Sequence, residues 1–133
     1  MHNPMIAILA AAVAAWLFGS AWYMGLARHY RTALGIHPDQ AVNMKPPLVP
    51  MLVCFLGELA LAWVLFTLMS PLGARTWFDG LMTGLLLGVV FTAIPITVNN
   101  LFQRRKLMMS VIDGVHWVAV AAIEGAILVA LLR

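Results

Sequence analysis

The chain has 133 residues, of which 63% are hydrophobic and only 10% are charged, and its mean hydropathy is +0.95. A soluble domain of this size needs a larger share of polar residues to cover its surface, so the composition argues against one. The net charge of +3 comes from basic residues at the ends of apolar runs. That placement is typical of membrane orientation, so we expect no nucleic-acid partner.

The first apolar run extends from Pro4 to about Leu26 and is long enough to cross a bilayer. A cleaved signal peptide is the alternative, because the small residues that begin at Gly19 resemble a cleavage site. The residues before the run lack the usual Lys or Arg, so we expect a retained span. A polar segment follows from Ala27 to Pro47. Its RHYRTAL part predicts a short interfacial helix, and its GIHPDQ part predicts a turn and a new helix start.

Three further apolar runs predict spans at about residues 48–69, 77–102 and 107–132, with the first at 4–26. We therefore expect a single all-α domain over residues 1–133, a four-transmembrane-helix bundle made of two antiparallel helical hairpins. The first loop and the last turn together carry six Lys or Arg residues, against two on the opposite side. The positive-inside rule then predicts that both termini are non-cytoplasmic.

Small residues recur at every fourth position in three of the spans. Lipid tails provide no hydrophobic drive for helices to associate, so such stripes mark close helix contacts, either within the chain or in a homo-oligomer. Pro95 interrupts the third span and predicts a kink, because it removes one helical hydrogen bond. The stripes are Ala7, Ala11, Ala15 and Gly19; Gly80, Gly84, Gly88 and Thr92; and Ala122, Ala126 and Ala130.

Three carboxyl groups and one imidazole fall well inside the predicted spans, beyond the first turn, where ionisable groups are costly and usually face the bundle interior. Glu58 lies near the midplane and Glu124 lies toward the non-cytoplasmic end, whereas Asp113 and His116 follow the last turn closely. On a helix, Asp113, His116 and Glu124 share a stripe about 80° wide. We expect that stripe to point inward.

The end of the third span adds amides and a base at a similar depth, because the turn into the fourth span is tight. We therefore predict a polar cluster that binds a ligand. The structural alternative is that Asp113 pairs with Arg104 or Arg105 while Asn99 caps the turn, which would lock the hairpin. The candidate site residues are Asn99, Asn100, Arg104, Asp113, His116, Glu58 and Glu124.

Sequence motifs of known enzyme classes do not occur: there is no paired-histidine metal spacing, glycine-rich phosphate loop, or serine or cysteine elbow. We therefore predict no catalytic residues and no metal ligands, and we do not expect an enzyme. The cofactor, if there is one, is unknown. A haem held between His116 and a second histidine would show as visible absorbance.

Three elements of the sequence stand out in order along the chain. They are a G..WY element from Gly19 to Tyr23, an N.LFE.R-like turn at Asn100 to Arg104, and an IDG..W element that ends at Trp117. Together they resemble a bacterial membrane family known as domain of unknown function 1761, over nearly the whole chain. The chain departs from the family pattern at Gln103, where an acid is common, and at His116, near an aromatic position. The resemblance implies a four-helix integral membrane protein and no particular activity.

These observations favour a small integral membrane protein of the bacterial inner membrane. We expect it to bind or pass a small molecule, lipid or ion through a polar pocket between its helices, as a homo-oligomer in the lipid bilayer. The alternative is a structural or accessory subunit of a larger membrane complex with no transport or catalytic activity. Buried polar groups without partners would favour the first function, and paired-off polar groups beside a flat apolar face would favour the second.

Overall fold

The computed structural model describes residues 3–37 and 47–132, and within these residues it is all-helical, with no strand. Four long helical segments are apolar enough to cross a membrane, which confirms the predicted fold class. The segments are α1 (Pro4–Gly25), α4 (Leu48–Met69), α7 (Leu107–Leu132) and the composite helix α5 (Trp77–Gly88), η1 (Val89–Ala93) and α6 (Ile94–Phe102).

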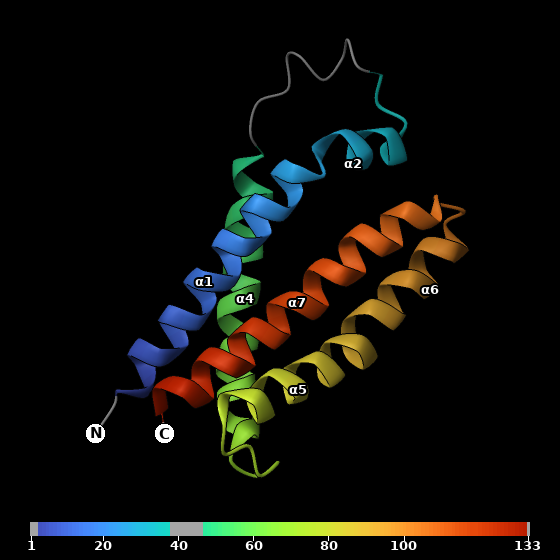
Figure 1. Ribbon diagram of the computed structural model, residues 1–133. Helices are drawn as coiled ribbons and strands as arrows, with labels where there is room; N and C mark the ends of the chain where they lie inside the picture. Colours follow the sequence, from blue (N-terminus) through green and yellow to red (C-terminus); the bar gives the residue numbers. More distant parts are fainter. Residues whose placement is uncertain (1–2, 38–46, 133) are drawn as a thin grey trace.

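A short polar helix, α2 (Ala27–Leu34), follows α1 and ends at Gly35, which adopts the left-handed conformation that favours glycine. This is the short helix that the RHYRTAL segment predicts. The helix start predicted after GIHPDQ lies outside the described residues. Helix α1 begins and α7 ends at one end of the bundle, called here the termini end (Figure 1). The opposite end carries α2 and the α6–α7 turn and is called the basic end.

Helix α7 is the centre of the bundle and packs against α1, α4 and the composite helix (Figure 1). In its most apolar stretch 44% of the residues are buried, compared with 11% in the composite helix. The composite helix and α4 touch each other very little. The composite helix depends on α7 for its place, whereas α4 packs against both α1 and α7. The two predicted hairpins are therefore joined through one helix.

Glycines bring α5 and α7 into backbone contact. A Cβ atom added at Gly80 would lie 2.2 Å from the carbonyl oxygen of Gly125, and one added at Gly84 would lie 2.0 Å from that of Ala121. Gly88 continues the same face against Val118. The glycine stripe of the third span is thus used inside the chain, because only residues without a side chain allow this approach.

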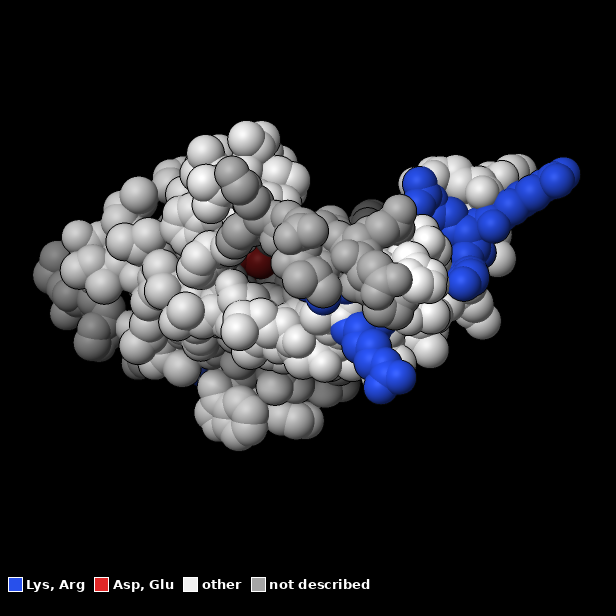
Figure 2. All heavy atoms as spheres, turned by 90° about the horizontal axis from the view of Figure 1, so that it is seen from above, with Lys and Arg blue, Asp and Glu red and all other residues white. Residues whose placement is uncertain are grey.

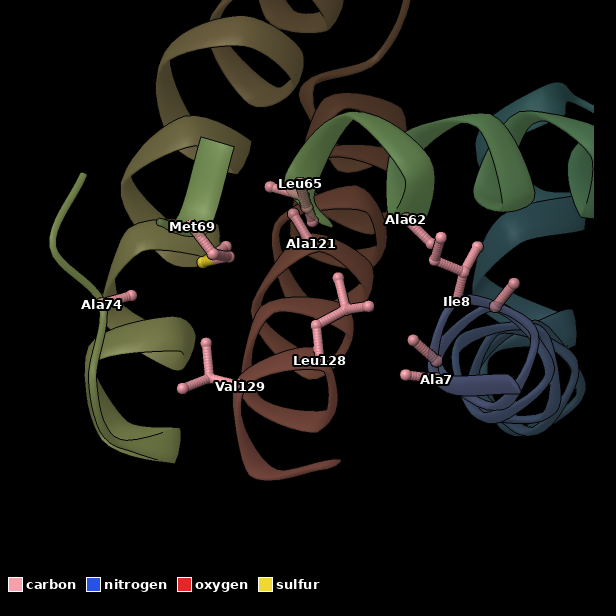
Figure 3. Packing of buried hydrophobic residues seen from close by; sticks show 11 residues of the cluster. Ala7, Ile8, Ala62, Leu65, Met69, Ala74, Ala121, Leu128 and Val129 are labelled. Atoms are coloured by element: carbon pink, nitrogen blue, oxygen red, sulfur yellow. The ribbon is translucent and has the colours of Figure 1, made fainter. Parts of the chain in front are cut away.

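The other faces of α7 meet α1 and α4 in an apolar core near the termini end (Figure 3). Ile8 of α1, Leu65 of α4 and Leu128 of α7 are each no more than 1% exposed. Small residues such as Ala7 and Ala62 let the three backbones approach closely. This core closes the bundle below the polar side chains described in the next section.

The composite helix contains a π-helical turn, η1, which ends at Ala93, directly before Ile94 and Pro95. Proline cannot donate a helical hydrogen bond, and nearby hydroxyls satisfy carbonyl groups in this region: Thr97 donates to Ala93 O at 2.8 Å, and Thr92 donates to Gly88 O. The sequence predicts irregularity at Pro95 but not a π-helical turn. A π-helical turn contains one more residue than an α-helical turn. After it, the residue that faces α7 therefore comes about one position later in the sequence than in a regular α-helix.

This shift decides which of the two asparagines at the end of the third span faces α7. At 100° per residue, Asn99 would share the face of Gly88, yet the structure exposes Asn99 and turns Asn100 toward α7. Asn100 Nδ2 donates to Ser110 Oγ at 3.2 Å and links the two helices of the hairpin. The polar contact between the third and fourth spans is therefore made one residue later than the helical period predicts.

The α5–α7 contact gives a direct test of the fold. Gly84→Ala places a methyl group against the Ala121 carbonyl, so we expect the free energy of unfolding to fall by about 3 kcal/mol or more. Gly57→Ala on α4 is the matched control, because a Cβ there meets only Trp117 at an ordinary 3.7 Å. We expect that control to change stability by less than about 0.5 kcal/mol. Reversible unfolding in detergent measures both, and equal effects would contradict the close packing.

Candidate functional site

Three ionisable side chains are buried in the interior of the bundle between α1, α4 and α7. Glu58 comes from α4, and His116 and Glu124 come from α7, where they lie two turns apart. Their exposed fractions are 0%, 1% and 0%. The inward-facing stripe predicted on the fourth span is confirmed for His116 and Glu124, and Val120 between them is also fully buried.

The three side chains are poorly satisfied. Both ring nitrogens of His116, both carboxyl oxygens of Glu124 and Oε2 of Glu58 have no hydrogen-bond partner among the described residues. The Glu58 Oε1 atom accepts a long hydrogen bond from the thiol of Cys54 at 3.5 Å, one turn earlier on α4. Buried polar groups are hydrogen-bonded in nearly all folded proteins, so three such groups in one place need an explanation.

Aromatic rings and one glycine hold the His116 ring in place. Phe18 stacks nearly parallel to it, with centroids 6.3 Å apart, and the rings of Tyr23 and Trp117 lie at 4.9 Å and 5.3 Å. A Cβ added at Gly19 would lie 2.5 Å from His116 Nε2 and 3.6 Å from Glu58 Oε1. The imidazole and the carboxyl therefore flank the same point on α1, which stays open only because residue 19 is glycine.

The element from Gly19 to Tyr23 docks α1 onto α7 at three successive contacts. Gly19 faces His116, the Trp22 indole donates to the carbonyl of Ile112 at 3.1 Å, and the Tyr23 hydroxyl donates to Asp113 Oδ1 at 2.7 Å. The G..WY and IDG..W elements singled out in the sequence thus contact each other. The sequence analysis singled out this element but did not predict its hydrogen bonds.

Asp113 is half-buried and has a different partner from the predicted one. It accepts from Tyr23 and forms no ion pair within the part of the chain that the structure describes, so the predicted pairing with Arg104 or Arg105 is not found. The tyrosine hydroxyl reaches the carboxylate across the α1–α7 contact, whereas the bases stay exposed at the turn. Asp113 therefore fastens α1 to α7 rather than locking the last hairpin.

Tyr30 of α2 adds an edge-on ring contact to Tyr23, with centroids 5.3 Å apart. Burial raises the pKa of the Tyr30 phenol above its ordinary value, and the nearby Asp113 carboxylate raises it further. Tyr30 is therefore a neutral phenol at physiological pH. The rings of Tyr30, Tyr23 and His116 thus follow one another from α2 into the bundle.

The predicted site residues thus fall into two groups. Glu58, His116 and Glu124 meet in the interior, and Asp113 lies one turn from His116 at the edge of that group. The end of the third span does not join them. Asn100 bonds to Ser110, whereas Asn99 and Arg104 are exposed at the basic end. Gly19, Tyr23 and Cys54 belong to the site, although the sequence analysis did not include them as candidates.

The environment of the interior group is apolar, and an ionised carboxylate there needs a cation beside it to offset the lost hydration. Glu58 and Glu124 interact electrostatically across the α4–α7 contact but share no hydrogen bond. Within residues 3–37 and 47–132, no three His, Cys, Asp or Glu side chains stand close enough to hold a metal ion.

Four apolar helices around a buried polar group define a small polytopic membrane protein. The chain belongs to the family described as protein of unknown function (DUF1761), whose model matches residues 6–129. That match confirms the family resemblance seen in the sequence. No curated protein and no solved structure shows significant similarity to the chain.

The contact between Gly19 and His116 gives a second test. Gly19→Ala forces the imidazole out of its ring-lined place, so we expect a loss of about 1–3 kcal/mol in stability. The same change made in a His116→Ala background should cost much less, because the added methyl group enters the space that the ring leaves. The coupling free energy in this double-mutant cycle is expected to be about 1–2 kcal/mol. Strictly additive effects would show that the two residues do not touch.

Proposed function

We propose that this protein binds a proton or a small monovalent cation at Glu58, His116 and Glu124 and exchanges it with the basic end of the bundle. The observation that carries the proposal is the burial of these three ionisable side chains with five unpartnered polar atoms. Ionisable groups inside a membrane typically mark ion pathways and proton relays.

The size of the site supports a small cargo. Two grooves on the surface of the described residues have none of Glu58, His116 and Glu124 in their lining. The space beside Gly19 is already shared by an imidazole nitrogen and a carboxyl oxygen. A proton needs no cavity, because it can reside on a carboxyl oxygen that Glu58 or Glu124 leaves without a partner, or on a ring nitrogen of His116.

Side chains that can carry a proton follow one another between the basic end and the site. Asp113 shares a hydrogen bond with Tyr23, and the Tyr23 ring lies 4.9 Å from His116. His116 and Glu58 then flank Gly19, and Glu124 follows two turns after His116 on the same helix. An imidazole accepts a proton on one nitrogen and donates from the other, so His116 is suited to the middle of such a series.

Glu58→Gln and Glu124→Gln test this proposal. Each change removes a carboxyl group but keeps its shape, and neither breaks a hydrogen bond between two helices, so folding should be retained. In proteoliposomes with a pH-sensitive dye, or a dye for Na⁺ or K⁺, we expect each variant to abolish the ion movement of the parent protein. Infrared difference spectra across a pH or salt step should lose one carboxyl band per variant.

Gly57→Ala is the control, because residue 57 neighbours Glu58 on the same helix but is exposed at the lipid-facing surface. The proposal would be contradicted if the parent protein and both variants fold alike and the parent shows neither ion movement nor a carboxyl band that responds to pH or salt. That result would favour the alternative of a structural or accessory subunit.

We further propose that the basic end is cytoplasmic and that the membrane is the bacterial inner membrane, with both termini on the other side. All described Lys and Arg residues except Arg75 belong to the basic end, and Figure 2 shows them gathered there. In a Cys54→Ala background, Ser70→Cys should react with an impermeant maleimide in intact cells, whereas Gln103→Cys should react only after lysis. The reverse pattern would overturn this orientation.

Homo-oligomer formation stays a prediction. Two of the stripes that motivated it are buried inside the chain, since Gly80, Gly84 and Gly88 face α7 and the stripe that ends at Gly19 faces the core. An oligomer would therefore use the exposed apolar surfaces of α4 or α5. Native mass spectra of the protein count the copies directly.

A further inference from the structure

We propose that an anionic phospholipid binds along the outer face of the last hairpin, with its phosphate at Arg104 and Arg105 and one acyl chain in the groove between η1–α6 and α7. This site is separate from the interior group and does not depend on the function proposed for it. Three observations support it: the lining of the groove, its length, and the charge at its end.

The groove has a cavity volume of about 350 Å³ and an almost wholly apolar lining. One wall is formed by Val89, Ala93 and Thr97, and the other by residues of α7 from Leu107 to Val118. The Thr97 hydroxyl donates to a carbonyl of its own helix, so it presents its methyl group rather than a free donor. The Ser110 hydroxyl also lines the groove and accepts a hydrogen bond from Asn100. With both hydroxyls engaged in this way, the surface suits a hydrocarbon chain.

The two helices leave room for the groove because small residues line its floor. Gly114 faces Ala93, and a Cβ at residue 114 would lie 3.4 Å from the Ala93 methyl group. The π-helical turn at Val89–Ala93 widens the helix beside this point. A helix of regular period with larger side chains would close the gap between the two helices.

The length of the groove matches one leaflet. From Leu107 to Val118 the helix rises roughly 16 Å at 1.5 Å per residue. Half of a hydrocarbon core of about 30 Å is nearly the same distance. A lipid whose acyl chain lies in this groove therefore has its headgroup level with the residues that precede Leu107.

Those residues are Arg104, Arg105 and Lys106, all exposed. Arg104 has a φ of 55°, the left-handed conformation that helix ends usually give to glycine, and it terminates α6 together with the bond from Arg105 N to Asn100 O at 2.9 Å. An arginine kept where glycine is less strained points to a use for its charge. Guanidinium groups bind phosphate with paired hydrogen bonds. A zwitterionic headgroup also carries a positive charge, which repels the arginines and weakens this attraction, so an anionic headgroup is favoured.

Lys106 is already engaged, since its ammonium donates to the carbonyl of Thr32 at 3.1 Å and ties α2 to the turn. Arg105 donates through Nε to Gln103 at 3.1 Å, which leaves the outer nitrogens of its guanidinium for a ligand. The two arginines are therefore the phosphate-binding pair in this proposal, and Lys106 contributes by charge alone.

Native mass spectrometry of the full chain, released from nanodiscs of mixed phosphatidylglycerol and phosphatidylcholine, tests the proposal. We expect the parent protein to retain one phosphatidylglycerol and little phosphatidylcholine. Arg104→Gln with Arg105→Gln should weaken phosphatidylglycerol retention about tenfold or more. The matched control is Arg28→Gln with Arg31→Gln, which removes the same charge from α2 at the same end and should change retention by less than about twofold.

Val115→Trp fills the groove from its exposed rim, and Leu56→Trp on the lipid-facing side of α4 is its control. We expect only the first to reduce retention, with both proteins equally stable in a thermal scan. Equal losses from the two arginine pairs would overturn the proposal, because general attraction to the anionic surface would explain them. Equal retention of both lipids, or no effect of Val115→Trp, would overturn it as well.

Discussion

Close backbone contact between α5 and α7 is the constraint on which the other contacts of this bundle depend. In a bilayer, helices gain little by burying apolar surface against each other, so association requires small residues and van der Waals contact. Gly80 and Gly84 provide this on one face of α7, where the partner atoms are the carbonyl oxygens of Gly125 and Ala121. With α5 fixed on that face, the remaining faces of α7 are left for α1 and α4, and the inward polar stripe has only these two helices as neighbours.

Helix α1 is placed on α7 by a different kind of contact. Trp22 and Tyr23 donate hydrogen bonds to Ile112 and Asp113, and Gly19 lets the backbone approach His116. Polar bonds between membrane helices contribute modestly to stability, about 0.6 kcal/mol on average. They do specify register, because a shift of α1 by one residue along α7 would separate both donors from their acceptors. The position of His116 beside Glu58 is a consequence of that register.

The sequence was sufficient to predict the helices and their polar stripe, because both follow from local pattern. Apolar runs of about 20 residues are long enough to span a bilayer, and His116 and Glu124 share a face at the helical period. The partners of these residues were not predictable. Tyr23 near a span end fits an aromatic belt as well as a hydrogen bond to Asp113, and Asn100 replaces Asn99 only because a π-helical turn shifts the face. No pattern within one helix states which face of another helix it meets, so the meeting of Glu58 with His116 required the structure.

The interior group is costly to a bundle of this size. A protein that needed only a stable scaffold would gain from apolar residues of similar volume at Glu58 and Glu124, since buried ionisable groups often destabilise relative to such replacements. The tight packing of α7 against α5 and α1 provides the stability that offsets this cost. An energetically unfavourable arrangement of residues that the surrounding structure holds in place is typical of functional sites. The packing contacts and the unpartnered side chains are therefore two parts of one arrangement, in which α7 presents glycine and alanine to α5 and His116 and Glu124 to α1 and α4.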